Sequence, residues 1–338
     1  RLTDVTGVQT CALPIYKLYN RFPGVLITIP RTVVLSTDIF DEFMDHNNLY
    51  SVALSDVPDD EILNRFLAAE LPVRVYQDFQ AFLAVSRNHP IAVRSSSKLE
   101  DSHYQPFAGI YSTYMIPRHP DNRNMVKLIS DAIKEVYASV YYKGSKAYMT
   151  ATANLIDEEK MGIIIQEVCG SRHGDIFYPT LSGVAQSINY YPIGSEKAED
   201  GIANIAVGLG KLIVEGGLSL RFSPRHSKKI LQLSSVENAL RDTQKEFRAL
   251  DLKVEHFVPS TDDGVNILRL GINEINNDAA MKYAASTYDY NNNILRDGIN
   301  YQGKRVVTFA NILQHNLFPL AEILCTLLDL GQKEMNNP

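Results

Sequence analysis

The chain has 338 residues, of which 45% are apolar and 21% charged, as in an ordinary soluble globular protein. This length exceeds what one hydrophobic core usually holds, so we expect two lobes. The formal net charge of −6 excludes a chain-wide basic surface for nucleic acid or an anionic membrane, although a few Arg and Lys side chains can still form a local phosphate pocket.

The cysteines and the apolar runs exclude further classes of protein. Cys11, Cys169 and Cys325 are far apart in the sequence, match neither a zinc site nor a disulfide framework, and suit a reducing compartment. The apolar run Met161–Val168 is much shorter than the roughly 20 residues that span a bilayer, and Arg1–Ile15 lacks the pattern of a secretory signal. We therefore expect a cytoplasmic protein with no membrane or nucleic-acid partner.

The first 15 residues differ from the rest of the chain. The stretch RLTDVTGVQTCALPI resembles translated sequencing-adapter sequence, so it is left out of the fold argument; the alternative is a genuine disordered tail. We expect it to make few contacts with the fold. The expected organisation is a tail over residues 1–16, a first lobe over 17–155 and a second lobe over 156–338.

Strand and helix signals alternate through the first half of the chain. A β-branched strand is expected at Thr32–Leu35, followed by a helix that Asp38 can cap. Apolar residues at helical spacing predict three helices before Pro90 and a long one after Pro120. Their expected buried faces are Ile39, Phe40, Phe43 and Met44; Ile62, Leu63, Phe66 and Leu67; Phe79, Phe82 and Leu83; and Met125, Leu128, Ile129, Ile133, Val136 and Val140. Short strands are expected at Ile91–Val93 and Tyr111–Ile116.

The second half is richer in strand signals, after a polar stretch at Thr150–Glu159 where we place the boundary between the lobes. Apolar runs predict four strands. They are Met161–Val168, Gly183–Ile188, Ile202–Val207 and Val265–Leu270. Val236, Leu240 and Phe247 have helical spacing and predict a helix within Ser235–Leu250. The apolar stretch Phe309–Leu330, which contains Pro319, is also expected to be helical. Together these elements predict two mixed α/β lobes.

The most informative stretch is IAVRSSSKLEDSHYQPFAG, Ile91–Gly109. Arg94 ends a buried strand and precedes Ser95 and Ser96, and a guanidinium among hydroxyls and loop amides suits phosphate oxygens. Glu100 and Asp101 could then hold a metal ion or fix Arg94. On residue types alone, the favoured interpretation is an Arg–carboxylate pair that braces a loop.

This stretch resembles the nucleotide-binding signature of phosphoenolpyruvate synthase and pyruvate, phosphate dikinase. The signature is an apolar-Val-Arg-Ser-Ser run, an acidic pair and then Phe-Ala-Gly, which here ends at Gly109. By this resemblance Arg94 contacts the ATP phosphates and acts in phosphoryl transfer, while Ser95 and Ser96 shape the wall of the pocket. The resemblance runs from about Phe22 to the C-terminus. It implies an α+β, ATP-grasp-like, two-lobed nucleotide-binding domain of the pyruvate phosphate dikinase type.

A second stretch, MGIIIQEVCG, is an apolar strand with a polar side chain near its end. The family has a similar segment lining the adenine site, so the resemblance implies that Gln166, Glu167 and Val168 lie on the adenine side. A core strand that ends at the surface would give the same pattern.

The third stretch is AVGLGKLIVEGGLSLRFSP. Gly208 and Gly210 after a strand allow close approach of the backbone to an anion. The spacing fits neither a P-loop nor a dinucleotide fingerprint. It resembles the family's Gly-Leu-Gly-Glu segment of the Mg-ATP site, but Lys211 stands in place of Glu. Glu215, about one helical turn later, is then the candidate ligand for Mg²⁺.

Two arginines and the histidines complete the prediction. Arg221 and Arg225 follow where the family places cationic phosphate contacts. The family's phosphate-carrying histidine has a Gly-Gly-x-Thr-x-His context, which none of the eight histidines has. We therefore expect the carrier histidine and the pyruvate-binding site on other domains of a longer parent protein. The glycine-rich lysine loop and the acidic Mg²⁺ residue of the family are also expected outside this chain, so the chain alone should be inactive.

The resemblance implies an ATP- and Mg²⁺-dependent phosphotransferase, in which ATP phosphorylates a carrier histidine and the phosphoryl group then passes to pyruvate. Catalysis would rest on positioning and electrostatic stabilisation of the phosphates. Two alternatives stay open: a related dikinase that acts on another acceptor, and a non-catalytic nucleotide-sensing module, which Lys211 favours.

Overall fold

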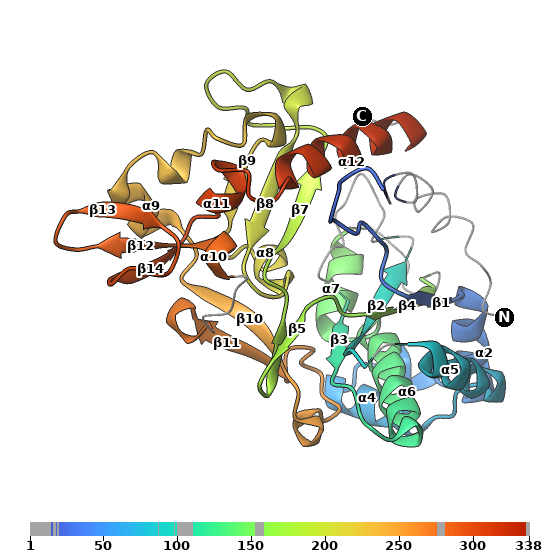
Figure 1. Cartoon of the computed structure of the whole chain (residues 1–338). Helices are drawn as coiled ribbons and strands as arrows, with labels where there is room; N and C mark the ends of the chain where they lie inside the picture. The colour runs from blue at the N-terminus through green and yellow to red at the C-terminus, as the bar shows by residue number, and fades with distance from the viewer. Residues whose placement is uncertain are drawn as a thin grey trace. The chain divides into compact units, whose positions relative to one another are not determined.

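The computed structural model describes residues 15, 18, 20–86, 88–97, 99, 111–152, 159–275 and 281–335. These ranges contain helices and antiparallel strand pairs, joined by loops. The predicted α+β class is confirmed (Figure 1). The chain divides into two compact units. The first contains Ile29–Cys169 and Asp251–Ile267, and the second contains Gly170–Leu250 and the described parts of Thr6–Thr28 and Leu268–Pro338.

This division differs from the predicted lobes in three places. The described residues 18 and 20–28 belong to the second unit, although the first lobe was expected to begin at residue 17. The first unit extends to Cys169 rather than ending near residue 155, because the strand that starts at Met161 pairs with strands from the start of the chain. The first unit also includes Asp251–Ile267, which comes from the second half of the sequence. Local composition could not show these last two features, since both depend on pairing between distant segments.

The first unit is built on a four-stranded sheet in the order β1-β4-β2-β3. The strands are β1 (Thr32–Leu35), β4 (Met161–Glu167), β2 (Ile91–Ser97) and β3 (Thr113–Ile116). Alternate side chains of β2 and β4 on one face, such as Val93 and Ile165, are fully buried in the core. The strand Thr32–Leu35 has its predicted bounds, and β2 is longer than predicted, because it continues through Arg94 and the serines.

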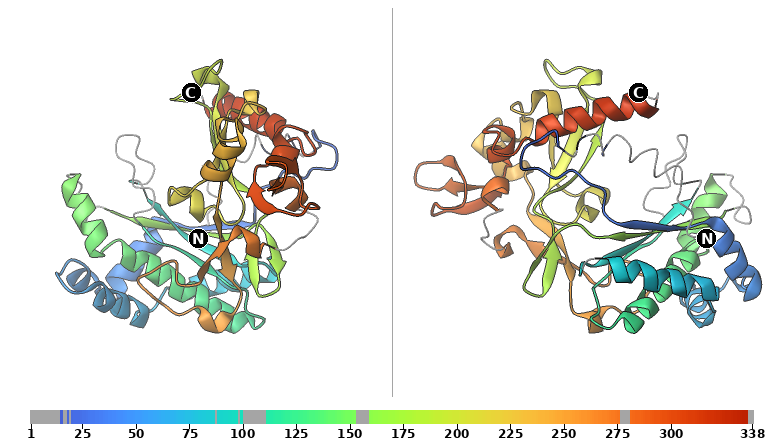
Figure 2. Two further views of the ribbon diagram at one scale, coloured as in Figure 1. Left: turned by 90° about the vertical axis from the view of Figure 1, so that its left-hand side faces the viewer. Right: turned by 45° about the vertical axis from the view of Figure 1, so that its right-hand side comes forward.

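Helices cover the buried face of this sheet (Figure 2). The helix α6 contacts the sheet, and two further helices pack on α6. The helices of the unit are α2 (Thr37–His46), α3 (Tyr50–Ala53), α4 (Asp59–Ala68), α5 (Val73–Val85), α6 (Asn122–Ser139) and α7 (Lys143–Ala151). The predicted apolar faces of α2, α4, α5 and α6 are buried, except that Leu67 and Leu128 are only partly so. One detail was wrong: α2 follows Ser36, so Asp38 lies in its first turn and does not cap it.

The segment Asp251–Ile267 is held on the first unit by hydrogen bonds to β3 and α6. Ser260 donates its backbone N–H to Glu135 Oε1 at 2.8 Å and accepts a bond from the Tyr114 hydroxyl at 2.8 Å. The Asp263 carboxylate accepts from the Thr113 N–H at 2.9 Å. Burial raises the pKa of Glu135 to about 8, so this carboxyl is mostly neutral at pH 7. We call this segment the strap.

The second unit contains three sheets around a separate core. Their orders are β7-β8-β9, β11-β10-β6-β5 and β13-β12-β14. The strands are β5 (Ser171–His173), β6 (Ile176–Tyr178), β7 (Ser182–Gln186), β8 (Ile202–Ala206), β9 (Leu220–Phe222), β10 (Glu246–Asp251), β11 (Ile267–Gly271), β12 (Ala285–Asp289), β13 (Ile294–Asp297) and β14 (Lys304–Val307). The helices are α8 (Lys211–Val214), α9 (Val236–Asp242), α10 (Met281–Ala284), α11 (Ala310–Leu313) and α12 (Leu320–Met335).

Two helical predictions in the second unit need correction. The stretch Ser235–Leu250 is a helix only to Asp242, and Phe247 lies in β10. The backbone turns extended at Thr243, and the Gln244 side chain bonds the backbone of Val207 instead of facing solvent on a helix. The stretch Phe309–Leu330 is likewise divided into α11 and α12, with the second helix beginning after Pro319.

Candidate functional site

One face of the β1-β4-β2-β3 sheet is opposite the face that the helices cover, and we call it the open face. It carries the two most specific predicted residues of the first unit. Side chains of a strand alternate between faces, so Arg94 lies on the face opposite the buried Val93. Arg94 is paired with Ile164 and with Thr113 across its two neighbouring strands, and Gln166 is paired with Ala92. Since paired residues share a face, Arg94, Thr113 and Gln166 all project from the open face.

The Arg94 side chain is exposed, and it makes no hydrogen bond or ion pair with the residues that the structure describes. An arginine in an inner strand is held in place by the sheet, while its guanidinium is left for a ligand. In the alternative interpretation, Arg94 pairs with a carboxylate such as Glu100 or Asp101, and both of these lie outside the described residues. The predicted site residue Gly109 also lies outside them. Within the described ranges, the guanidinium is therefore available for an oxyanion such as phosphate.

The two serines after Arg94 are on different faces of β2. Ser96 shares the open face with Arg94, whereas Ser95 faces the side covered by helices. Both are half-buried, and Ser95 has a polar partner. Strand alternation thus places only Ser96 beside Arg94, so a joint role of both hydroxyls on one pocket wall does not follow from the geometry.

Gln166 is fixed by a short chain of hydrogen bonds at the edge of the sheet. Its Nε2 donates to Thr32 Oγ1 at 2.8 Å, and the Thr32 hydroxyl donates to the Pro30 carbonyl at 2.9 Å. The side chain of the next residue, Glu167, lies on the opposite face of the sheet and is buried. Val168 is also buried, and its N–H donates to the Pro90 carbonyl at 2.9 Å. Of the three predicted adenine-side residues, Gln166 alone presents a polar side chain on the open face. Thr32 was not among the predicted site residues, because its only signal is a hydroxyl in an otherwise apolar strand.

The glycine segment lies in the second unit, at the end of β8. The Gly208 N–H donates to the Pro179 carbonyl at 3.1 Å, and the Leu209 N–H donates to the Arg248 carbonyl at 2.8 Å. Gly208 has φ +88°, and a Cβ there would lie 2.6 Å from the Arg248 carbonyl oxygen. The glycine is therefore required by close packing against β10, and its amide is already used within the unit. Around Gly210 there is more room, since a Cβ would meet nothing closer than 3.8 Å.

Glu215 and Lys211 bracket the short helix α8. The Glu215 carboxylate Oε2 accepts bonds from Arg248 Nε at 3.1 Å and Nη2 at 2.8 Å, and Arg248 also bonds Glu246. Burial alone would lower the pKa of Arg248, but its bonds to these two carboxylates raise it. Gly216 and Gly217 end α8 in a Schellman motif, with N–H groups donating to Ile213 and Leu212.

These contacts bear on the predicted Mg²⁺ ligand. The Glu215 oxygen that faces Arg248 is occupied by a guanidinium, and Lys211 lies one turn before it. Among the residues that the structure describes, no group of three or more His, Cys, Asp or Glu side chains is arranged to hold a metal ion. The described residues therefore do not form a ligand set for Mg²⁺ around Glu215, and the role of Glu215 as a ligand stays a prediction.

Arg221 and Arg225 have separate partners within the second unit. Arg221, on β9, donates from Nη2 to Asn189 Oδ1 at 2.9 Å and to the Tyr191 carbonyl at 2.7 Å. Arg225 donates to Asp329 Oδ1 on α12 at 2.6 Å. The exposed Arg225–Asp329 ion pair links η3 (Pro224–His226) to the C-terminal helix, so this arginine has a structural partner, whereas no carboxylate in the described ranges pairs with Arg221.

The fold and these groups define an α+β protein in which an exposed sheet arginine has no partner among the described residues, an arrangement suited to a phosphorylated ligand. The chain matches the family described as "Pyruvate phosphate dikinase, AMP/ATP-binding domain" over residues 15–256, which is more than half of its length. The chain belongs to this family. The resemblance predicted from its motifs is confirmed.

A curated relative extends the comparison. The chain is 27% identical over 193 residues to the uncharacterized phosphotransferase YvkC of Bacillus subtilis (strain 168). The aligned part covers 57% of this chain and 21% of the relative, so the chain spans about a fifth of that protein's length. No helix in the described ranges is both long and apolar enough to cross a membrane.

Proposed function

We propose that this chain is the ATP-binding part of a phosphotransferase similar to phosphoenolpyruvate synthase, with Arg94 as the residue that contacts the ATP phosphates. In the parent protein, ATP would phosphorylate a carrier histidine on another domain, and the phosphoryl group would then pass to pyruvate. The observation that carries the proposal is the exposed Arg94 guanidinium, which has no partner in the described part of the chain and projects from an inner strand.

The residues of the open face have distinct roles in this proposal. Arg94 binds phosphate oxygens through charge-assisted hydrogen bonds, and Ser96 and Thr113 are its polar neighbours on the same face. Gln166, held by Thr32, is oriented toward the adenine side of the ligand. Because the sheet fixes these groups before ATP arrives, little ordering is needed on binding. Mg²⁺ is expected with ATP, but no step is assigned to it, since Glu215 is bound to Arg248.

Calorimetric titration with Mg-ATP tests the role of Arg94. Arg94→Ala should weaken binding by about 1.5–3 kcal/mol, the usual value of a hydrogen bond to a charged group, or roughly 10- to 150-fold. Arg94→Lys should restore part of this affinity, since an ammonium keeps the charge but not the guanidinium fork. Arg65→Ala is the matched control, because Arg65 is an exposed arginine of the same unit on the far-side helix α4. Equal affinity for Arg94→Ala and Arg65→Ala would remove Arg94 from the site.

A second candidate function is a non-catalytic nucleotide sensor, which one observation favours. Lys211 replaces the family's Glu, and the nearby Glu215 is engaged by Arg248. A transfer assay with labelled ATP on the full-length parent separates the two: phosphohistidine formation supports the enzyme, and ATP binding without transfer supports the sensor. The same assay with other acceptors tests a dikinase of different specificity. The isolated chain should show no transfer, because none of its histidines has the carrier context.

A further inference from the structure

A cavity of about 630 Å³ lies wholly within the second unit. Its walls are the loop after β7, the β9 strand, the turn through Lys228 and the residues of η4 (Leu231–Leu233), with Gln314 at one end. This volume is within the range of small-molecule sites in proteins, which is roughly 300–1,000 Å³. The lining does not include Gly208, Gly210 or Lys211, so the cavity is separate from the glycine segment.

Three cationic side chains line this cavity: Arg221, Lys228 and Lys229. Arg221 donates to two neutral oxygens, and Lys229 Nζ donates to the Ser195 hydroxyl at 2.9 Å. Lys228 is exposed and has no polar partner within the described ranges. None of the three is therefore paired with a carboxylate in that part of the chain. Three cations against the one carboxylate in the described lining give it a net positive charge, which favours an anionic ligand.

Glu196, the one acidic side chain among the described lining residues, is already engaged. Its Oε2 accepts from Asn189 Nδ2 at 3.0 Å and from the Ile193 N–H at 3.0 Å. Asn189 Oδ1 in turn accepts from Arg221. The loop is thus folded by its own polar side chains, and Glu196, which holds the loop, offsets only one of the three positive charges.

The remaining walls are apolar. Ile193, Ile230, Leu231 and Leu233 contribute to the lining, and Leu231 is 60% exposed although it is a large aliphatic side chain. An inorganic anion would leave this surface in water. A ligand with both phosphate oxygens and an apolar or aromatic body would use both kinds of wall.

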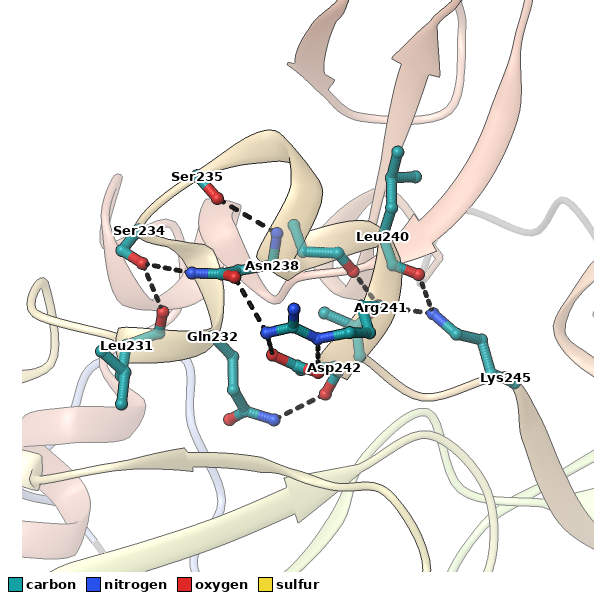
Figure 3. A network of polar contacts seen from close by, with 11 residues as sticks. Leu231, Gln232, Ser234, Ser235, Asn238, Leu240, Arg241, Asp242 and Lys245 are labelled. Atoms are coloured by element: carbon teal, nitrogen blue, oxygen red, sulfur yellow. Dashed lines mark hydrogen bonds and ion pairs between the residues drawn. The ribbon is translucent and has the colours of Figure 1, made fainter.

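The apolar wall is fixed in place by a polar network with α9 (Figure 3). Gln232 Nε2 donates to the Ser219 and Asp242 carbonyls at 2.9 and 2.8 Å, and its Oε1 accepts from the Arg221 N–H at 2.8 Å. Ser234 Oγ donates to the Leu231 carbonyl at 2.7 Å and accepts from Asn238 Nδ2 at 2.9 Å. Arg221 and Leu231 are thus connected to one rigid support, so the cavity is largely formed before a ligand binds.

We propose that this cavity is a second ligand site, which binds an organic phosphate with an apolar or aromatic body, a nucleotide being one such compound. Lys228 and Lys229 bind the phosphate oxygens, the free part of the Arg221 guanidinium adds to them, and the aliphatic side chains cover the body of the ligand. All lining residues belong to the second unit, whereas Arg94 belongs to the first, so the inference does not depend on the function proposed for Arg94.

Calorimetric titration of the Arg94→Ala protein with ATP tests the site, because that variant weakens the first proposed site. Adding Lys228→Ala and Lys229→Ala should lower the remaining affinity at least about tenfold, as expected for losing charge-assisted contacts. Lys127→Ala is the control, since Lys127 is an exposed lysine of the other unit. Arg221 is left intact because its substitution would release the loop. Unchanged affinity in the lysine variants would overturn the proposal.

Two further arms define the ligand. ATP should bind more tightly than inorganic pyrophosphate, and adenosine should bind least; pyrophosphate binding as tightly as ATP would contradict the role of the apolar wall. Glucose 6-phosphate, which lacks an aromatic body, separates sugar phosphates from nucleotides. Photolabelling with an azido-ATP should modify peptides that contain residues 193–196 or 228–234. Labels confined to other peptides would overturn the site, whereas labels there with no effect of Arg94→Ala would overturn only the proposed role of Arg94.

Discussion

The two units use the residues of the family resemblance in different ways. In the first unit, Arg94 projects from a sheet face and has no polar partner within the described ranges. In the second unit, the amide of Gly208 and the carboxylate of Glu215 are engaged by Pro179 and Arg248. In the first unit, the family motif thus marks a group that has no partner in the described ranges and is available for a ligand. In the second unit, the family motif marks groups that stabilise the fold.

This difference shows why a motif residue must be judged by what its polar atoms already bind. A guanidinium without a partner gains the full strength of a charge-assisted bond when a phosphate arrives, whereas an amide in an internal hydrogen bond must first lose that bond. Substitutions of the motif residues Gly208 and Glu215 should therefore affect stability more than ATP binding, and the reverse should hold for Arg94. The following predictions test this contrast.

The largest effect is expected for Gly208→Ala. Its φ of +88° disfavours a side chain, and the new Cβ would meet the Arg248 carbonyl oxygen at 2.6 Å and Phe247 at 3.0 Å. Left-handed strain and overpacking together should lower the free energy of unfolding by about 3 kcal/mol or more. Urea-induced unfolding followed by circular dichroism measures this loss. Gly216→Ala is the control: its φ is +73°, but a Cβ there meets nothing within 4 Å, so only the strain of about 1 kcal/mol should remain.

The next effect concerns Glu135 under the strap. Its carboxyl is buried, its Oε2 has no hydrogen-bond partner in the described part of the chain, and its pKa is raised to about 8. A raised pKa in the folded state means that the stability it contributes is fully present below the ordinary pKa of 4.5 and is lost as the pH rises through about 8. Unfolding of the wild type should therefore become easier between pH 5 and 9, by on the order of a few kcal/mol.

Glu135→Gln sharpens this prediction because the amide is isosteric and uncharged. Its carbonyl can still accept the Ser260 N–H. The titratable groups that interact with Glu135 are Asp131, Tyr114 and Tyr142, and Tyr114 in turn interacts with Asp262 and Asp263. They remain in the variant, so the difference between the two pH profiles reports Glu135. Parallel profiles of wild type and Glu135→Gln would show that Glu135 has the same pKa in the folded and unfolded states, and would contradict the raised pKa.

Periodicity was sufficient to predict most of the first unit, because its helices bury one apolar face each and its strands are short apolar runs. Prediction failed where a side chain bonds a distant backbone. Gln244, which bonds Val207, ends the expected helix of Ser235–Leu250, and the strap is drawn to the first unit by Glu135, Tyr114 and Thr113. Nothing local to these residues indicates a partner more than 30 positions away.

The site shows the same limit. The resemblance indicated Arg94 and Gln166, and strand register then placed both on one face. The resemblance could not show that Ser95 lies on the other face. The strand was expected to end at Val93, so strand alternation was not applied to the serines. The pairing of Glu215 with Arg248 was also beyond reach, because 33 residues separate them.

A smaller effect is expected for Glu215→Gln. The variant loses the charge that faces Arg248 but keeps an acceptor oxygen, and Arg248 retains Glu246. Because this ion pair is partly exposed, the unfolding free energy should fall by only about 1 kcal/mol. Mg-ATP affinity should stay at the level of Glu237→Gln, which neutralises an exposed carboxylate of the same unit. A loss of Mg-ATP affinity much larger than the loss of stability would instead support Glu215 as a metal ligand.

An effect on stability of similar size is expected for Thr32→Val, which tests how Gln166 is held. Valine has the shape of threonine and suits a strand, but it cannot bond Gln166 Nε2 or the Pro30 carbonyl. The unfolding free energy should fall by about 0.5–1.5 kcal/mol, the usual net value of a hydrogen bond at a half-buried position. Thr113→Val controls for the substitution in unfolding experiments, since the Thr113 hydroxyl has no partner within the described ranges. In Mg-ATP titrations, Thr32→Val should reduce affinity by less than Arg94→Ala does, because it loosens Gln166 without removing a charge. Should Thr32→Val weaken binding as much as Arg94→Ala, the adenine side rather than the phosphate contact would dominate recognition on this face.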